Sequence, residues 1–193
     1  MRYIKSKGCI LSVVTNGVLL EKNAEQIVED GWDMILVSFD GPRDIHDACR
    51  NRPGAFDTAV AGLRRINAVK KSAGRVKPFV LTSTTISNVN AHVLPETFEI
   101  GRDLDPDLMV VYLSWFTSEE IGKAQTVILE RELGITPFTW KSYATTFSPE
   151  DAELFRTALS NVKRRKWPFE YMVIPDLSER DFVRYYTEPA EMF

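Results

Sequence analysis

The sequence has 193 residues, with 24 Lys and Arg against 27 Asp and Glu, and a formal net charge of −3 at pH 7. Its 44% hydrophobic content is enough for one domain with a buried core. The negative balance disfavours nucleic acid as a main partner, because a phosphate backbone requires a concentrated basic surface. No apolar run reaches the roughly 20 residues of a membrane span, and the first residues lack a signal-peptide pattern. We therefore expect a cytoplasmic protein without a membrane partner.

Short aliphatic runs alternate with segments of helical spacing along the chain. The runs are continuous rather than alternating, which indicates strands buried on both faces, and they cover Ile10–Thr15, Met34–Phe39, Phe79–Ser87, Leu108–Phe116 and Phe169–Ile174. Helices are predicted around Ala24–Val28, Phe56–Val69, Val93–Leu104, Ser118–Leu133 and Pro149–Lys166. Ser118 and Ser148 are typical N-caps, and Gly134 is a typical stop.

This order of strands and helices predicts an α/β fold with parallel strands and right-handed crossovers. Five strands are too few to close an eight-stranded barrel. They fit an open doubly wound sheet or an incomplete barrel, and both architectures place functional residues at the C-terminal strand ends.

Polar residues follow the first two predicted strands directly. The first strand ends in Thr15-Asn16-Gly17, and the second ends in Ser38-Phe39-Asp40-Gly41. Each segment taken singly is ordinary turn chemistry. Taken together, they form a rim of hydroxyl, amide and carboxylate groups that suits a ligand with a ribose diol, an ammonium and a carboxylate.

Longer motifs make this rim more specific. TNGxLL covers residues 15–20, SxDGPxxxHDxxR covers 38–50 and GxF covers 54–56. These motifs resemble the third and fourth strand ends of radical S-adenosylmethionine (radical SAM) enzymes, in the peptide-modifying and sulfatase-maturase-like branch that carries a SPASM domain. The resemblance covers residues 8–117, most closely 8–66. It implies a partial (β/α) TIM-type barrel that lacks the first strands. Residues 1–193 would be a single domain, with 118–193 a helical linker toward a missing C-terminal domain.

The resemblance also implies S-adenosylmethionine and a 4Fe-4S cluster as cofactors of the intact family. Carried over residue by residue, Ser38 and Asp40 would meet the ribose hydroxyls. Arg50 would pair with the methionine carboxylate, as a guanidinium fork does. Thr15 and Asn16 would line the floor beside the cofactor. No residue is assigned a catalytic role.

Two family motifs are absent from the sequence. The family binds its cluster through CxxxCxxC and the methionine ammonium through a GGEP segment, and neither occurs here. Cys9 and Cys49 cannot supply the three thiolates that such a cluster needs. We therefore expect a fragment, truncated at both ends, that binds no cluster alone, has no metal site and is inactive as this chain.

Two other functions remain open. A half-barrel could be a non-catalytic interaction module, and open sheet edges also predict self-association. Alternatively, an unrelated (β/α) enzyme could use Asp40, His46 and Asp47 for acid–base chemistry. Both His46 and Arg50 also have a purely structural interpretation. His46 would hold its loop, and Arg50 would pair with Asp47 on the surface. The substrate, a peptide or a small molecule, is not identified.

Overall fold

A computed structural model describes residues 1–145 and 147–188. Its single sheet has strand order β1-β2-β3-β4-β5, and the strands are β1 (Ser12–Thr15), β2 (Met34–Ser38), β3 (Phe79–Thr85), β4 (Leu108–Tyr112) and β5 (Glu170–Ile174). Every pairing is parallel. The five predicted strands are confirmed, and each is shorter than predicted because buried apolar residues beyond the strand ends, such as Phe39, Ile86 and Leu113, belong to loops.

Eight α-helices and two 3₁₀ turns accompany the sheet in the described part of the chain. They are α1 (Arg2–Ser6), α2 (Leu20–Glu29), α3 (Arg43–Cys49), α4 (Ala55–Ser72), η1 (Ala91–Val93), α5 (Leu94–Leu104), α6 (Glu119–Leu133), η2 (Thr139–Ser142), α7 (Pro149–Lys163) and α8 (Glu179–Thr187). Among these, none combines the length and apolar character needed to cross a bilayer.

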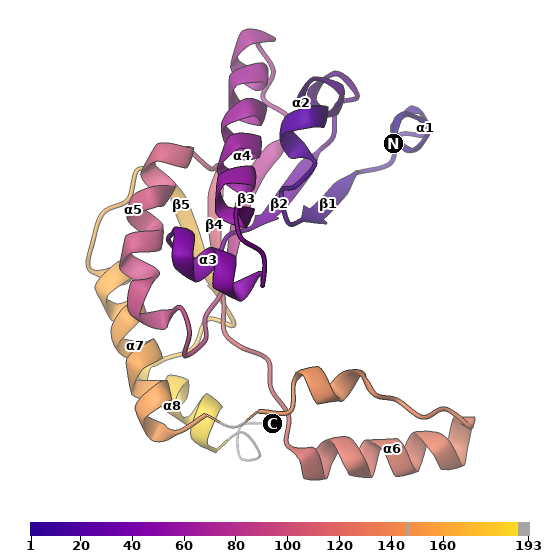
Figure 1. Ribbon diagram of the computed structural model, residues 1–193, viewed down its shortest axis with the longest axis vertical. Coiled ribbons are helices and arrows are strands. Elements are labelled where there is room, and N and C mark those ends of the chain that lie inside the picture. The colour runs from indigo at the N-terminus through magenta and orange to yellow at the C-terminus, as the bar shows by residue number, and fades with distance from the viewer. Residues whose placement is uncertain (146, 189–193) are drawn as a thin grey trace.

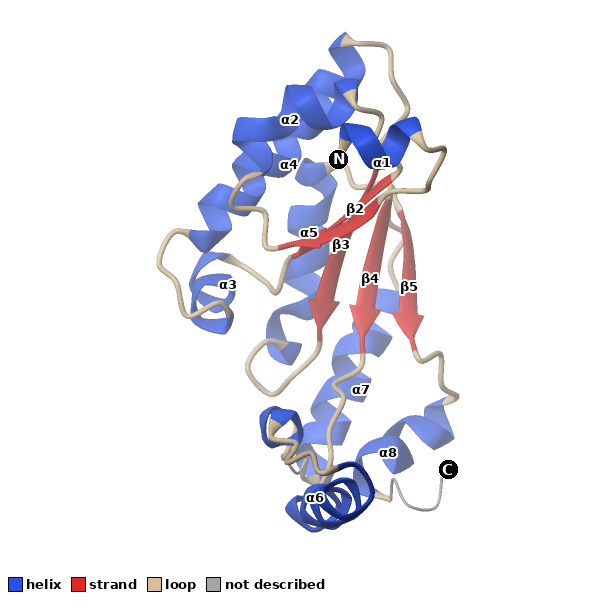
Figure 2. Cartoon of the chain, turned by 90° about the vertical axis from the view of Figure 1, so that its right-hand side faces the viewer, coloured by secondary structure: helices blue, strands red, loops and turns tan. Residues whose placement is uncertain are grey.

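Helices α2, α4, α5 and α7 lie on one side of the sheet (Figures 1 and 2). The strand order follows the chain order, whereas a doubly wound sheet reverses its order and carries helices on both faces. The architecture is therefore consistent with a partial (β/α) barrel.

The two faces of the sheet differ in burial. On β2, Ile35 and Val37 are fully buried under the helices, whereas Leu36 and Ser38 point to the other face and are only partly buried. On that face the outer strand β1 leaves Val14 69% exposed. The prediction of burial on both faces is therefore wrong for β1 and β5 and holds for the middle of β3 and β4. No described helix covers the second face (Figure 2), so only the central strands gain cover from their neighbours.

Two hydrophobic clusters fill the space between sheet and helices. One joins β2 to α2 and α4, and the other joins β4 to α5, α7 and α8. The turn after β1 packs tightly against the first cluster, because Gly17 adopts φ +84° and a Cβ there would lie 3.0 Å from the Cα of Ala59. Glycine is thus required at the turn that carries Asn16.

The predicted helix caps are confirmed. The hydroxyl of Ser118 accepts a hydrogen bond from the backbone N–H of Ile121, and Gly134 ends α6 in the left-handed conformation. Ser148 and Asp151 form a reciprocal capping box at α7. These local signals placed the helix ends well because a cap depends only on residues within one turn.

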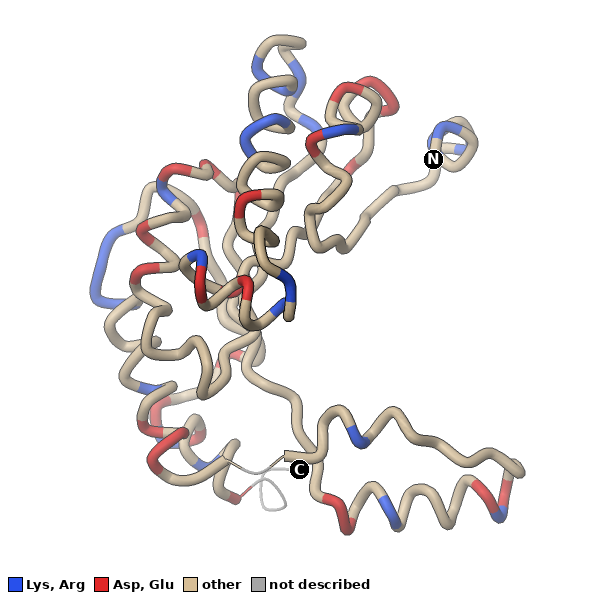
Figure 3. Tube along the Cα trace, viewed as in Figure 1, with Lys and Arg blue, Asp and Glu red and all other residues tan. Residues whose placement is uncertain are grey.

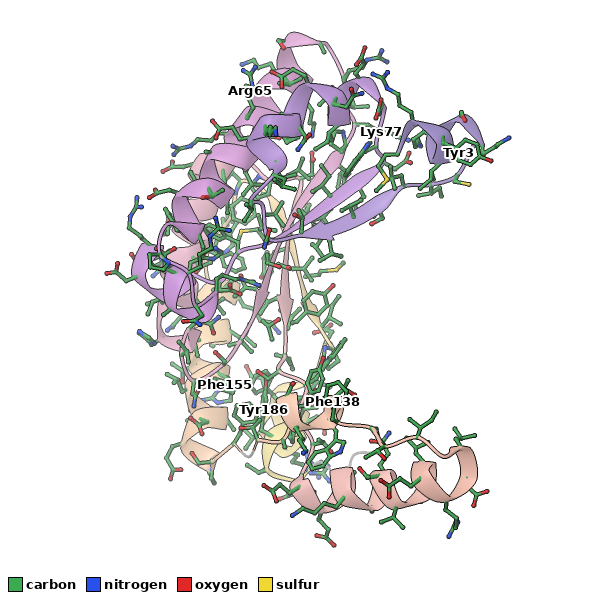
Figure 4. The ribbon with its side chains drawn as sticks, turned by 45° about the vertical axis from the view of Figure 1, so that its right-hand side comes forward. Tyr3, Arg65, Lys77, Phe138, Phe155 and Tyr186 are labelled. Atoms are coloured by element: carbon green, nitrogen blue, oxygen red, sulfur yellow. The ribbon has the colours of Figure 1, made fainter. Side chains whose placement is uncertain are left out.

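Residues 118–143, which we call the arm, project from the body as α6 followed by η2 (Figures 1 and 4). A β-bridge between Thr117 and Ala144 closes the base of the arm. Within it, the Trp140 ring lies on Gly122, where a Cβ would come within 2.2 Å of the ring. Trp140 Nε1 also donates a hydrogen bond of 3.1 Å to Thr126 Oγ1. Trp140 therefore ties η2 to α6 within the arm.

Asp33 connects three segments at the N-terminal end of the sheet. Its carboxylate accepts hydrogen bonds from the Lys5 ammonium, from Lys77 Nζ at 2.6 Å and from the Leu11 amide at 2.8 Å. The Lys5 bond, then the Lys77 and Leu11 bonds, hold the pKa of this carboxyl well below its usual range.

Replacing Asp33 with asparagine should lower the melting temperature at pH 7. A carboxyl whose pKa is lower in the folded state stabilises the fold above its unfolded pKa, about 4, and loses this effect as the pH falls below that value. The Asp33→Asn variant should therefore respond less to acid between about pH 5 and pH 2 than the parent. Thermal melts across this range test it, with Asp103→Asn on the exposed side of α5 as the matched control. Equal acid responses of parent and variant would contradict it.

Candidate functional site

The ends of β1 and β2 place the first candidate residues. Thr15 pairs in register with Val37, which is buried under the helices, so the Thr15 side chain lies on the helix-covered face. Ser38 lies on the open face, one residue beyond Val37. The same register, continued by one residue, puts Asn16 beside Ser38. The register therefore places Asn16 next to Ser38 along the strand ends and turns the Thr15 side chain to the opposite face from Ser38.

Asp40 and Arg50 form an ion pair just beyond the end of β2. Arg50 Nε donates a hydrogen bond of 2.6 Å to Asp40 Oδ2, and the side chains are 31% and 8% exposed, respectively. Among the described residues, neither terminal nitrogen of the guanidinium has a partner. Arg50 is therefore fixed by Asp40 and still presents the edge of its fork that can grip a carboxylate.

His46 holds the backbone at Asp40. Its ring is fully buried, with its centroid 5.4 Å from that of Phe39 and 6.2 Å from that of Phe56. His46 Nδ1 accepts a hydrogen bond of 3.1 Å from the Asp40 N–H, so the ring is neutral, with its proton on Nε2. Burial also lowers the pKa of His46. His46 therefore has a structural role and holds the loop after β2 in place.

The Asp47 side chain caps the start of α4. Its carboxylate accepts hydrogen bonds from the backbone N–H of Gly54 at 2.6 Å and of Phe56 at 2.8 Å. These two bonds lower the pKa of Asp47. Asp47 is thus a capping residue, and Arg50 pairs with Asp40 instead. With His46 buried as well, the geometry gives no support to an acid–base trio of Asp40, His46 and Asp47.

A cavity of about 500 Å³, here called the strand-end cavity, lies at the C-terminal ends of β3 and β4. It is lined by Thr85, Ser87, Asn88, Tyr112, Leu113, Ser114, Trp115, Tyr143, Thr145 and Phe147. The sequence marks Ser87-Asn88 and Ser114-Trp115 as strand-end positions. It gives no signal for Tyr143, Thr145 and Phe147, because these residues reach the cavity from the far side of the arm.

Helix α8 fixes one wall of this cavity. The Tyr185 hydroxyl donates to the Ser114 carbonyl at 3.2 Å, and the Ser114 N–H donates to the Tyr186 hydroxyl at 3.3 Å. The Ser114 hydroxyl donates to the carbonyl of Ile86. Burial raises the pKa of Tyr186, so its hydroxyl stays protonated. The residue before Trp115 is therefore held on both sides.

A second hollow of about 330 Å³, here called the arm groove, lies between the arm and the end of β4. It is lined by Trp115, Phe116, Thr117, Gln125, Thr139, Trp140 and Tyr143. Trp115 and Tyr143 border both hollows, and they are 65% and 47% exposed. The strand-end cavity and the arm groove thus share two aromatic side chains.

The residues present do not fit an iron–sulfur cluster. Cys9 precedes β1, and Cys49 ends α3 beyond the C-terminal end of β2, so the two free thiols belong to opposite ends of the sheet. Within residues 1–145 and 147–188, no group of three or more His, Cys, Asp or Glu side chains is arranged to hold a metal ion. Asn16 and Ser38 at the strand ends and Arg50 at the end of α3, by contrast, carry amide, hydroxyl and guanidinium groups, which suit a nucleoside bearing a carboxylate.

The sequence is similar to two curated proteins of Methanosarcina barkeri (strain Fusaro / DSM 804). It is 33% identical over 105 residues, 53% of the chain, to the AdoMet-dependent heme synthase. It is 30% identical over 99 residues, 51% of the chain, to the Fe-coproporphyrin III synthase. The matches span 28% and 23% of the length of these relatives. No protein-family model matches the sequence. The two similarities support a relationship to the radical SAM superfamily.

Proposed function

We propose, from this relationship, that the chain is the S-adenosylmethionine-binding part of a radical SAM enzyme of the SPASM-containing branch. The observation that carries the proposal is the Asp40–Arg50 pair, which holds a guanidinium with an unused edge at the strand ends where the family motifs occur. A cation fixed in this way suits the carboxylate of the methionine part. In radical SAM enzymes, bound S-adenosylmethionine is the source of a 5′-deoxyadenosyl radical, and this chain would contribute binding and orientation.

Each of the candidate binding residues then has a separate task. Arg50 binds the methionine carboxylate, and Asp40 positions Arg50 while its second oxygen faces the ribose. Ser38 and Asn16 supply the hydroxyl and amide that hydrogen-bond the ribose diol. Thr15 supports the turn from beneath, because its Oγ1 accepts a hydrogen bond of 3.1 Å from the Gly17 N–H.

The adenine ring would lie in the strand-end cavity. Neighbouring strands are about 4.8 Å apart, so the ends of β2 and β4 are separated by about 10 Å, which an extended S-adenosylmethionine can span. The cavity offers aromatic rings at Tyr112 and Trp115, and the Asn88 amide has no partner among the described residues. Aromatic faces and an amide edge suit a neutral, planar heterocycle.

Titrating ¹⁵N-labelled protein with S-adenosylmethionine tests this function. The amides of Asn16 and Ser38 and the Trp115 indole should shift together, with a dissociation constant in the range of about 1 mM or below. Asn16→Ala should weaken binding about threefold to tenfold, the loss of one hydrogen bond. Asn23→Ala on exposed α2 is the matched control. If only residues at the N-terminal strand ends shift, such as Asp33 and Lys77, the proposal is wrong.

A second candidate function is protein association through the uncovered sheet face. It is favoured by the exposure of Val14 (69%) and Ile10 (83%) at the β1 edge, because exposed apolar edges promote association. Signals of the β1 residues that broaden with protein concentration in the same spectra would support it. This association is compatible with S-adenosylmethionine binding at the strand ends.

A further inference from the structure

We propose that the arm groove binds a planar, conjugated and uncharged ring compound, and that this is the substrate position of the protein. As a substrate position it rests on the proposed function, since the groove adjoins the cavity assigned to adenine. Binding of such a compound can nevertheless be measured without S-adenosylmethionine, so the two assignments can fail separately.

The groove has an aromatic side chain on each side, and both stand on held segments of the chain. Trp140 is fixed on Gly122 and by its hydrogen bond to Thr126, and it forms the wall on the side of the arm. Trp115 forms the opposite side, and the hydrogen bonds of Ser114 to α8 fix the backbone just before it. Two rings on held backbone segments offer a stacking surface that needs little reorganisation on binding.

Trp115 is unusual in its exposure. Tryptophan is highly buried on average, but the Trp115 side chain is 65% exposed between two hollows. Phe116, the next residue, instead packs inward and stacks on Tyr186 with ring centroids 5.7 Å apart. The chain therefore packs one of these adjacent aromatic residues partly into the core and leaves the other exposed, where a bound ring could cover it.

The polarity of the groove defines the class of ligand. Among the described residues, no charged side chain lines it, so an ionic group would lose hydration there without a counter-charge. The side chains of Thr117, Gln125 and Thr139 line it and make no hydrogen bond within the described chain. A ring with carbonyl or N–H groups at its edge would satisfy them. The volume of about 330 Å³ lies within the range of small-molecule sites.

Lumichrome, a neutral tricyclic compound with carbonyl and N–H edges, is a suitable probe. Its fluorescence anisotropy should rise to saturation as the parent protein is added. Trp115→Ala should weaken binding about tenfold, the loss expected for one stacking ring, and Trp115→Phe should restore part of it. Gln125→Ala should weaken binding a few-fold. Trp32 packs against the cluster of β2, α2 and α4, so Trp32→Phe should leave the lumichrome affinity unchanged. Unaltered circular dichroism shows that each variant is folded.

Two outcomes would overturn the assignment. The first is unchanged lumichrome affinity in both Trp115→Ala and Gln125→Ala. The second is displacement of lumichrome by adenosine, which would place the probe in the strand-end cavity rather than in the groove. Amide shifts of Asn16 and Ser38 with S-adenosylmethionine are independent of both outcomes, so the proposed function would survive either. Anthraquinone-2-sulfonate, a planar anion, should bind more weakly than lumichrome, and tighter binding of the anion would contradict the uncharged class.

Discussion

Replacing Phe39 with alanine is expected to lower the free energy of unfolding by about 3–5 kcal/mol. Phe39 is fully buried, and its ring packs against His46 and Phe56 with centroids 5.4 and 5.6 Å away. Removing the ring leaves a cavity under α3 and loosens the histidine that holds the Asp40 backbone. Urea denaturation followed by circular dichroism measures the stability change.

The arm provides a matched control for this substitution. Phe138 is 71% exposed, so Phe138→Ala removes the same atoms from water-accessible surface and should change stability by no more than about 0.5 kcal/mol. A loss in Phe39→Ala as small as that in Phe138→Ala would mean that α3 is not anchored through this ring.

Arg50→Ala is expected to cost about 2 kcal/mol of stability and to abolish measurable S-adenosylmethionine binding. The stability loss follows because the nearly buried Asp40 carboxylate loses its charged partner. The binding loss follows from the proposed contact with the methionine carboxylate. Urea denaturation and the NMR titration measure the two effects separately. Arg52→Ala, two residues along and exposed, is the control and should change neither.

A double substitution separates the two roles of Arg50. Because Asp40→Ala removes the carboxylate that Arg50 neutralises, the Asp40→Ala/Arg50→Ala variant should be destabilised by less than the sum of the single variants. It should still fail to bind S-adenosylmethionine. If the double variant binds as the parent does, Arg50 is a structural residue only.

The strands and caps could be predicted from the sequence because their signals are local. A continuous apolar run such as Leu108–Phe116 marks a central strand whatever surrounds it, and Ser148 with Asp151 closes a cap within one turn. Helix α3 was not predicted, since its seven residues Arg43–Cys49 bury only His46. A segment that short has no apolar stripe to read.

The candidate site was predicted less completely, because it depends on three-dimensional placement. Alternation of side chains along a strand puts Thr15 and Ser38 on opposite faces, and this requires the register, which the sequence does not contain. The Asp40–Arg50 pair arises only when α3 folds back over the end of β2. Tyr143 reaches the strand-end cavity through the path of the arm, which no local motif encodes.

The sequential strand order has a consequence for how the chain assembles. Each strand pairs with the one made before it, so the sheet can grow in the direction of synthesis without waiting for later segments. The length of chain between paired strands differs along the sheet. Ser12 pairs with Met34, whereas Leu108 pairs with Glu170, and the whole arm and α7 lie between them in the sequence. Because closing a longer loop costs more chain entropy, β5 and the α8 clamp on Ser114 should be the last parts to order. The wall beside Trp115 would then be completed only at the end of folding.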